Sequence, residues 1–403
     1  KYKGAISVKE LSRIASAVQA STTMAIDAMF KQMKADGVDV IGFGAGEPDF
    51  NTPDNIKAAG IAAIEQNVTR YTPAAGTVEL RQAVCGRMKA DYGLEYKPSQ
   101  VVVSSGAKHL VYLALRAVVN PGDEVILPAP YWVSYIELIK MVGGVPVVVT
   151  ATEAEHFKLT AEKLSAAITP RTKAILLNNP SNPTGMMYDR EELEAIAAVC
   201  TQADIYVISD EIYACLAYDG RTFTSFASLS ADAKERTILV NGVSKAYAMT
   251  GWRIGYACAN DVIAKVMANY VSHSTGSPVA ISQRAAAVAL SGSQAEIETM
   301  RQAFEQRRNY IVERMNAIPG VSCIQPEGAF YVMMNLEQLL GKTIHGVEIT
   351  NDDVFADAFL KYGLVAVVPG SGFGAPNFVR WSYATSMENI KEGLDRLEKF
   401  LPE

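Results

Sequence analysis

Short apolar runs alternate with amphipathic stretches from about residue 95 onward. Seven of these runs are rich in branched aliphatic residues and have the length of strands: 101–103, 124–127, 145–149, 174–177, 205–208, 238–240 and 254–257. Several are almost continuously apolar, as expected for strands that are covered on both faces. Segments of helix length lie between many of them, including 108–119 and 191–200. Because strand, crossover and strand is the signature of a parallel sheet, the pattern predicts a doubly wound α/β fold.

A different pattern begins near residue 294. One helical stripe is apolar there and stops at Pro319-Gly320; its members are Ile297, Met300, Phe304, Ile311 and Met315. Further strands are predicted over 329–334, 365–368 and 378–382. We therefore expect a long helix that connects the α/β core to a second, smaller domain. The first 45 residues, with a helix over 25–34 and a strand over 40–43, are expected to join that domain.

The composition is that of a large, well-packed protein, because 49% of the 403 residues are hydrophobic and 20% are charged. The net charge of −6 argues against nucleic acid or an anionic membrane as a partner, so any bound anion must be held by a local site. Five scattered cysteines form no C-x-x-C pair, and with four histidines they predict no metal site. No apolar run reaches the ~18 residues that a membrane span needs. We expect a cytoplasmic protein with reduced thiols.

Polar residues follow the predicted strands where ligands bind in an open parallel sheet. The first strand runs into a small-residue turn, "SSGAK" (104–108), that enters a helix and suits an anion. Asp210 follows the fifth strand and Lys245 the sixth, while Arg253 precedes the seventh. The fourth is followed by "NNPSNPTG" (178–185), with the amides of Asn178, Asn179 and Asn182.

Taken singly, these features are a tight turn, a loop, a strand cap and a surface lysine. Their coincidence at one sheet edge favours a shared site. A lysine can bind a carbonyl covalently, a carboxylate can hold a ring nitrogen, and a helix terminus can hold a phosphate. That combination indicates a site for pyridoxal 5′-phosphate (PLP).

Two glycine-rich segments offer a competing interpretation as dinucleotide-binding loops. "GFGAG" (42–46) is followed by Glu47-Pro48-Asp49, and the proline opposes the helix that such a loop requires. "PGSGFG" (369–374) also precedes no helical pattern. The sequence therefore disfavours a nicotinamide or flavin enzyme.

Ordered motifs extend over nearly the whole chain: "GEPDF" (46–50), "RYTPAAGTVELR" (70–81), "PYWVSY" (130–135), "NNPSNPTG", "SDEIY" (209–213), "SKAYAMTGWRIGY" (244–256), "PEGAFYV" (326–332) and "VRWSYATS" (379–386). The set resembles the class I and II aminotransferases of PLP fold type I, most closely the bacterial aspartate aminotransferases and their aspartate/prephenate-type subgroup. The resemblance implies a large PLP-binding domain over 48–296, with a mainly parallel seven-stranded sheet flanked by helices. It implies a smaller α/β domain from residues 1–47 and 297–403, and a homodimer with shared active sites.

The resemblance also implies the cofactor-binding residues. Lys245 would bind the cofactor covalently and move a proton, Asp210 would pair with the ring nitrogen, and Tyr213 would donate to the ring hydroxyl oxygen. The remaining implied contacts are Asn182 at the same oxygen, Trp132 on the ring, Ser105, Gly106, Ala107 and Arg253 at the phosphate, and Tyr71 from the neighbouring subunit. One position departs from the pattern, because Gly242 stands where some relatives carry a phosphate-binding serine.

Substrate contacts follow in the same way. Arg380 matches the residue that grips the α-carboxylate, with Gly46, Asn182 and Trp132 beside it. A planar arginine suits a carboxylate better than lysine does. Lys108 and "STT" (21–23) match a subgroup in which lysine binds the distal carboxylate, and "SHSTGSP" (272–278) lacks the arginine that other relatives use.

The implied reaction moves an amino group between L-aspartate or glutamate and 2-oxoglutarate or oxaloacetate by a ping-pong mechanism, with prephenate as a further acceptor. Three alternatives remain open because the fold alone does not determine the reaction. They are a PLP-dependent carbon–sulfur lyase, an aminotransferase for aromatic or neutral amino acids, and a non-catalytic protein on this scaffold. An intact Lys245 and Asp210 argue against the last.

Overall fold

Seven strands form the central sheet of the computed structural model, which describes residues 9–18 and 22–401. Their order is β2-β8-β7-β6-β5-β3-β4. Their bounds are Val101–Ser104 (β2), Glu124–Ala129 (β3), Val145–Thr150 (β4), Thr172–Asn178 (β5), Tyr206–Asp210 (β6), Thr237–Gly242 (β7) and Gly255–Cys258 (β8). Only β8 runs antiparallel to its neighbours, β2 and β7, within this sheet. The seven expected strands and the mainly parallel sheet are confirmed.

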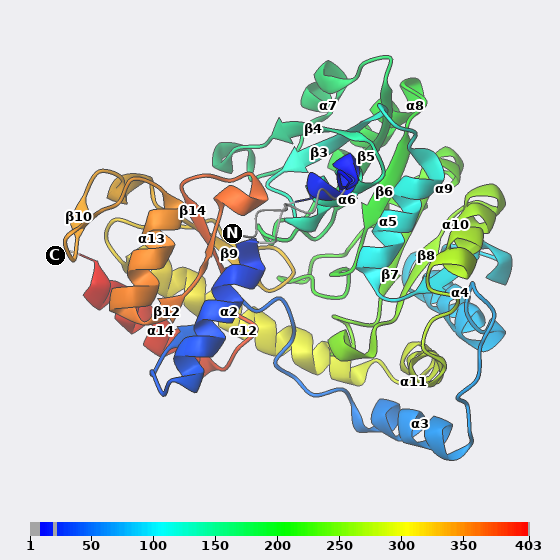
Figure 1. The fold of residues 1–403 in the computed structure, drawn as a ribbon, viewed down its shortest axis with the longest axis horizontal. Helices are drawn as coiled ribbons and strands as arrows, with labels where there is room; N and C mark the ends of the chain where they lie inside the picture. The colour runs from blue at the N-terminus through cyan, green and yellow to red at the C-terminus, as the bar shows by residue number, and fades with distance from the viewer. Residues whose placement is uncertain (1–8, 19–21, 402–403) are drawn as a thin grey trace, which may run out of the picture.

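Helices cover both faces of this sheet (Figure 1). One face packs against α5 (Ala107–Val118), α6 (Ser134–Met141) and α10 (Asp261–Ser274). The other packs against α4 (Val78–Tyr92), α7 (Ala161–Ala167), α8 (Arg190–Gln202), α9 (Ala231–Arg236) and α11 (Ala280–Ser291), and α3 (Asp54–Glu65) lies on α11. Successive side chains of one strand serve the two cores, since Val207 and Ile208 on β6 belong to opposite clusters. The doubly wound α/β fold is therefore confirmed.

The strand β4 departs from the expectation that the apolar runs are covered on both faces. It lies at the edge of the sheet, and Val145 and Val148 are each 42% exposed. Hydrophobicity alone does not distinguish an edge strand from a central one, because both favour branched aliphatic residues.

A smaller unit is built from both ends of the chain (left in Figure 1). Its three-stranded antiparallel sheet has the order β13-β14-β9, from Val368–Pro369, Phe378–Ser382 and Tyr331–Asn335. A separate parallel pair joins β1 (Ile41–Gly42) to β12 (Val365–Ala366), which confirms that the N-terminal segment joins the C-terminal one. Its other elements are α2 (Thr22–Ala35), β10 (Thr343–Ile344), β11 (Val347–Glu348), α13 (Asp352–Ala358) and α14 (Met387–Phe400), while α1 (Arg13–Ser16) lies near α6. The strand expected over 365–368 is divided between β12 and β13. The domain boundaries at 47/48 and 296/297 stay a prediction.

The long helix α12 (Ala295–Ala317) links the two units, as predicted. Its buried stripe includes Met300, Phe304, Ile311 and Met315, but Ile297 is only half-buried and packs against a core of the large sheet. The stripe also contains Arg308, which is fully buried and which sequence reasoning did not include. Its guanidinium donates to Asp219 at 2.6 and 2.9 Å and to the Pro326 carbonyl oxygen at 2.7 Å.

Within the described residues, no helix is both long and apolar enough to cross a membrane.

Candidate active site

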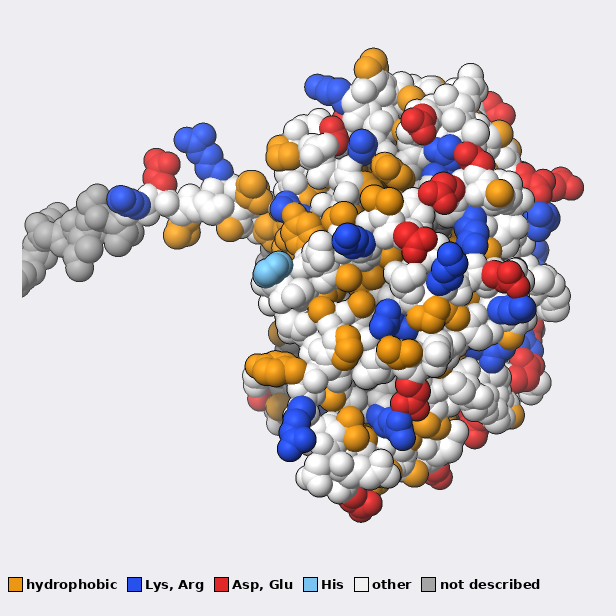
Figure 2. All heavy atoms as spheres, turned by 90° about the vertical axis from the view of Figure 1, so that its right-hand side faces the viewer, with side chains coloured by type: hydrophobic (Ala, Val, Ile, Leu, Met, Phe, Trp, Pro, Cys, Tyr) orange, Lys and Arg blue, Asp and Glu red, His pale blue; other side chains and the backbone are white. Residues whose placement is uncertain are grey.

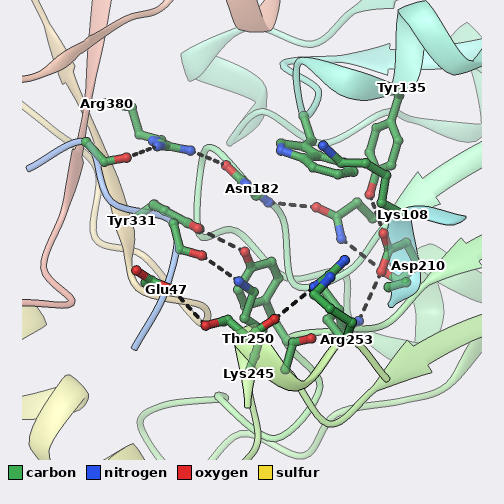
Figure 3. A pocket seen from close by; sticks show the side chains of 18 residues that line it. Glu47, Lys108, Tyr135, Asn182, Asp210, Lys245, Thr250, Arg253, Tyr331 and Arg380 are labelled. Carbon is green, nitrogen blue, oxygen red and sulfur yellow. Dashed lines mark hydrogen bonds between the residues drawn. The ribbon is translucent and has the colours of Figure 1, made fainter. Parts of the chain in front are cut away.

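A cavity of about 380 Å³ lies where the carboxyl ends of the large-sheet strands meet the smaller unit (Figure 3). Most of the predicted site residues line it: Gly46, Ala107, Lys108, Trp132, Asn182, Asp210, Tyr213, Lys245, Arg253 and Arg380. These residues span more than 330 positions of sequence, from Gly46 to Arg380. The fold thus brings the segments that follow several strands to one edge, as a parallel sheet requires.

Lys245 projects into this cavity from the loop that follows β7. Its Nζ donates a hydrogen bond to the Gly46 carbonyl oxygen. Burial lowers the pKa of Lys245 to about 8, against the opposing effect of the Glu47 carboxylate and with help from Arg253 and Arg380. A lysine of this kind is a free amine for a large fraction of the time near pH 8, which a surface lysine is not.

Asp210 ends β6 and lies at the floor of the cavity. Its two carboxylate oxygens accept hydrogen bonds from the Tyr135 hydroxyl at 2.7 Å and from the Ile212 amide at 3.2 Å. Burial raises the pKa of Asp210 to about 6, although both hydrogen bonds and Lys245 act in the opposite direction. A buried carboxyl of this kind favours a cationic partner beside it.

Arg380 enters the cavity from β14 and is 3% exposed. Its guanidinium donates to the Asn182 side-chain oxygen at 2.8 Å and to the Gly44 carbonyl oxygen at 2.9 Å. The rings of Tyr331 and Phe373 contact it, with centroids at 4.4 and 4.9 Å from its central carbon. Its Nε is buried and has no hydrogen-bond partner. The arginine is therefore held in place while part of its donor set stays unused.

The asparagine-rich turn after β5 supplies two of its three predicted amides. Asn178 and Asn182 line the cavity, and the side-chain oxygen of Asn178 accepts a hydrogen bond from the backbone N–H of Asn182 at 2.8 Å. Asn179 does not line it, because its side-chain oxygen accepts from the Tyr188 backbone at 3.1 Å. The expectation for Asn179 was wrong, since that amide secures the turn instead.

The turn predicted to bind an anion lies between β2 and α5, beside Arg253. The Arg253 guanidinium donates to the carbonyl oxygens of Ser105 at 3.0 Å and Thr250 at 2.9 Å. Gly106 has a φ of 89°, and a Cβ there would stand 2.5 Å from the Arg253 guanidinium, so only glycine fits. Ala107 lines the cavity, whereas Ser105 and Gly106 lie behind Arg253.

Lys108 and Trp132 form one wall. The Lys108 Nζ lies 4.8 Å from the centroid of the Trp132 ring, a cation–π distance. Burial lowers the pKa of Lys108, and Arg253 adds to this effect. The segment "STT" (21–23) was matched together with Lys108; Ser21 lies outside the described residues, and so do the side chains of Thr22 and Thr23.

Several residues that line the cavity were not assigned from the sequence, among them Tyr135, Tyr331 and Glu47. Tyr135 holds Asp210, Tyr331 shares a hydrogen bond of 2.9 Å with Tyr213, and Glu47 accepts from the Thr250 hydroxyl at 2.7 Å. All three lie within the motifs that carry the family resemblance, and this is the signal that the sequence offers for them. Their partners lie 75, 118 and 203 positions away, so no local pattern points to the contacts.

Tyr71 lies away from this cavity and is 98% exposed. It lines a separate hollow of about 680 Å³ made by residues 68–71 and 277–281. Within a single chain, therefore, Tyr71 is not part of the site.

The charges of the cavity are strongly unbalanced. Its basic side chains are Lys108, Lys245, Arg253 and Arg380, and across residues 9–18 and 22–401 none of them forms an ion pair. The acidic residues that line it are Glu47 and Asp210. No group of histidine, cysteine or acidic residues in the described part of the chain could hold a metal ion. The cavity is thus suited to organic anions.

Known proteins resemble this chain over almost its full length. It is 50% identical to an aspartate aminotransferase of Bacillus sp. (strain YM-2), with 94% of this chain and 96% of the relative aligned. It is 47% identical to an aspartate/prephenate aminotransferase of Cereibacter sphaeroides, over 97% of this chain and 98% of the relative. The crystal structure of the aspartate aminotransferase from Rhizobium meliloti superposes with a TM-score of 0.94 at 42% identity, over 98% and 99% of the two chains. The family description "Aminotransferase class I and II" matches residues 38–397. With this fold, this cavity and these relatives, the chain belongs to the class I and II aminotransferases.

Proposed function

We propose that the cavity binds PLP and transfers the amino group between aspartate or glutamate and a 2-oxo acid. The observation that carries this proposal is the arrangement of charge. Basic side chains that have no ion-pair partners among the described residues converge on a cavity whose floor holds the buried Asp210 carboxyl. A phosphate, a substrate carboxylate and a protonated ring nitrogen together would balance these charges.

The residues present fit the cofactor. The first turn of α5 and the Arg253 guanidinium form a cradle for a phosphate, which the close approach of Arg253 to Gly106 keeps compact. Trp132 offers a flat face, and Asp210 lies where it can hold a protonated ring nitrogen. When bound, PLP supplies an aldehyde carbon that takes the amino group and a pyridine ring that accepts the electron pair released at Cα. The Asn182 side-chain amide and the Tyr213 hydroxyl are donors available to the ring oxygen.

The chain's own residues divide the remaining work. Lys245, with its pKa lowered to about 8, is the base that takes the proton from the substrate Cα. The same side chain then delivers that proton to the carbon that was the cofactor's aldehyde carbon. Arg380 binds the α-carboxylate through the N–H groups of its terminal nitrogens that remain after the bonds to Asn182 and Gly44, and these two bonds fix its orientation. The Asp210 carboxylate would keep the pyridine nitrogen of the cofactor protonated. The hydrogen bond from the Tyr135 hydroxyl keeps Asp210 in place.

The preference for a dicarboxylic substrate rests on Lys108. This ammonium stands on the cavity wall opposite Arg380 and has no carboxylate partner among the described residues (Figure 3). Two oppositely placed cations suit a four- or five-carbon diacid. The relatives named aspartate aminotransferase and aspartate/prephenate aminotransferase support the same substrate class.

We further propose that the protein is a homodimer in which the partner's Tyr71 completes the phosphate site. Tyr71 and Val279 are 98% and 53% exposed beside the hollow of residues 68–71 and 277–281. The described part of the N-terminal arm stands away from the body, with hydrophobic side chains gathered at its base (Figure 2). Leu11 and Ile14 on this arm are 82% and 53% exposed. Apolar surface of this kind is typical of a protein–protein interface.

Half-reaction spectra of the PLP-loaded protein test the proposed function. Adding aspartate should remove the visible absorbance of the cofactor, and adding 2-oxoglutarate should restore it. Lys245→Ala should retain PLP weakly and lose turnover by many orders of magnitude. Release of pyruvate and ammonia from cystathionine without any 2-oxo acid would instead support a carbon–sulfur lyase. Near wild-type turnover in Lys245→Ala would exclude the proposed mechanism.

A further inference from the structure

Tyr331 is a fully buried residue at the start of β9 whose hydroxyl reaches the cavity. Its hydroxyl lies 2.9 Å from that of Tyr213, and this is its one hydrogen bond within the described chain. Either phenol can be the donor. Figure 3 shows Tyr331 between Arg380 and the Lys245 side of the cavity. Its position places it between the carboxylate-binding arginine and the tyrosine assigned to the ring oxygen.

The ring of Tyr331 makes two further contacts. The central carbon of the Arg380 guanidinium lies 4.4 Å from the ring centroid, close enough for a cation–π interaction. The Tyr213 ring meets it edge-on, with centroids 5.8 Å apart and an interplanar angle of 83°. A Cβ at Gly46 would stand 3.3 Å from the Tyr331 hydroxyl, so the "GEPDF" segment closes around this side chain. These contacts leave Tyr331 a single orientation.

The direction of the shared hydrogen bond decides what Tyr213 can do. A phenol has one proton to donate, so Tyr213 can donate into the cavity only if it accepts from Tyr331. Tyr331 has no competing acceptor among the described residues, so it is free to donate in this direction. Burial raises the pKa of Tyr331, while the neighbouring Arg380 cation and the hydrogen bond with Tyr213 act in the opposite direction.

We propose that Tyr331 is a positioning residue that serves two sites at once: its hydroxyl donates to Tyr213 so that Tyr213 donates to the cofactor ring oxygen, and its ring holds Arg380 in place for the substrate carboxylate. This inference rests on the proposed function, because it takes the ring-oxygen role of Tyr213 and the carboxylate role of Arg380 from it. It adds a residue that couples the two. The hydroxyl acts on Tyr213 and the ring acts on Arg380, so substitutions can remove one role and keep the other.

Two substitutions at this position separate the roles, and one elsewhere serves as the control. Tyr331→Phe removes the hydroxyl and keeps the ring, whereas Tyr331→Leu removes both. Tyr383→Phe is the matched control, because Tyr383 is a fully buried tyrosine that does not line the cavity; its hydroxyl donates to the Ala329 carbonyl oxygen at 3.5 Å and shares a hydrogen bond with Tyr218. Two quantities are measured on PLP-loaded protein: the pH midpoint of the visible absorbance change, and the dissociation constant of succinate, a diacid that cannot react.

Tyr331→Phe should raise the pH midpoint by about half to one unit. Without the Tyr331 hydroxyl, Tyr213 donates a weaker hydrogen bond to the ring oxygen and stabilises its deprotonated form less; one hydrogen bond contributes ~1 kcal/mol. Its succinate affinity should stay within about twofold of wild type, since the ring remains. Tyr331→Leu should shift the midpoint similarly and weaken succinate binding by roughly 5- to 30-fold, the range of a partly desolvated cation–π contact. Tyr383→Phe should change neither quantity.

A double substitution tests the relay itself. Tyr213→Phe should raise the midpoint more than Tyr331→Phe does, and adding Tyr331→Phe to it should cause no further rise, because the relay is already broken. Additive shifts would overturn the proposal, as would an unchanged midpoint in Tyr331→Phe. If Tyr331→Leu fails to fold, Tyr331→Phe and the double variant still decide the outcome. Wild-type protein without PLP absorbance would refute the proposed function, whereas normal wild-type behaviour with unresponsive variants would refute this inference alone.

Discussion

Replacing Lys108 with methionine would remove one charge from the cavity and keep a side chain of similar reach. The ammonium has no carboxylate partner in the described chain, so it is available to the distal carboxylate of a substrate. A hydrogen bond to a charged group contributes about 1.5–3 kcal/mol, which corresponds to roughly 10- to 150-fold in kcat/KM. Because Lys108 is exposed, we expect the lower half of that range for aspartate. The substitution also removes the contact with Trp132, worth ~0.5–1 kcal/mol, from every substrate alike.

The assay therefore compares the loss of kcat/KM for dicarboxylic amino acids with the loss for neutral ones. Values of kcat/KM are measured for aspartate and glutamate, and for alanine and phenylalanine, which lack a distal charge. The loss for the first pair should exceed the loss for the second by about tenfold. Lys108→Arg is the control for charge, and it should recover only part of the loss because a planar guanidinium replaces a compact ammonium. An equal fall for all four amino acids would refute the reasoning and indicate damage to the phosphate turn beside it. No change would assign distal recognition to other residues.

Asp210→Asn should slow single-turnover abstraction of the Cα proton by at least 100-fold, at ~1.4 kcal/mol per tenfold, and a loss below tenfold would reduce Asp210 to a strand-end cap. Mixed dimers of Tyr71→Phe with Lys245→Ala chains should show more activity than the two parents supply, as measured after unfolding and remixing; no gain would place each site within one chain. Burial raises the pKa of Glu211 to about 7, so its contribution to stability is present below about pH 4.5 and is lost as the pH rises through 7. Glu211→Gln should therefore flatten the fall in urea-unfolding free energy of the apoprotein between pH 5 and 8, and an unaltered slope would contradict the burial effect.

Much of the site could be predicted from sequence because its residues follow strand ends. Asp210 and Lys245 come directly after apolar runs, and the ends of parallel strands share one sheet edge. Arg380 has no such local signal, since it lies within β14 of the smaller sheet, and only the family resemblance pointed to it. The fold class was accessible for the same reason, because seven apolar runs with helical crossovers leave few topologies.

The rest depends on contacts between distant positions. Tyr135 and Tyr331 read as ordinary core aromatics, and nothing near them in sequence shows which polar group their hydroxyls meet. Arg308 occupies a helical stripe that predicts an apolar residue, and Asp219 and the Pro326 carbonyl oxygen accept hydrogen bonds from its two terminal nitrogens. The edge position of β4 was hidden because its composition matches a central strand. Each of these features is set by the neighbour that the fold supplies.

The unpaired basic groups of the cavity also tie the abundance of folded protein to the supply of small anions. Lys108, Lys245, Arg253 and Arg380 have no ion-pair partners among the described residues, and they repel one another until anionic ligands bind. A ligand that binds the native state alone stabilises it by mass action, by about 2.7 kcal/mol at a hundred times its dissociation constant. Chains made while the vitamin-derived cofactor is scarce would thus unfold more often and meet proteases more often than chains made while it is plentiful. The charges that recognise the ligands would therefore make the lifetime of the folded protein depend on the supply of the cofactor.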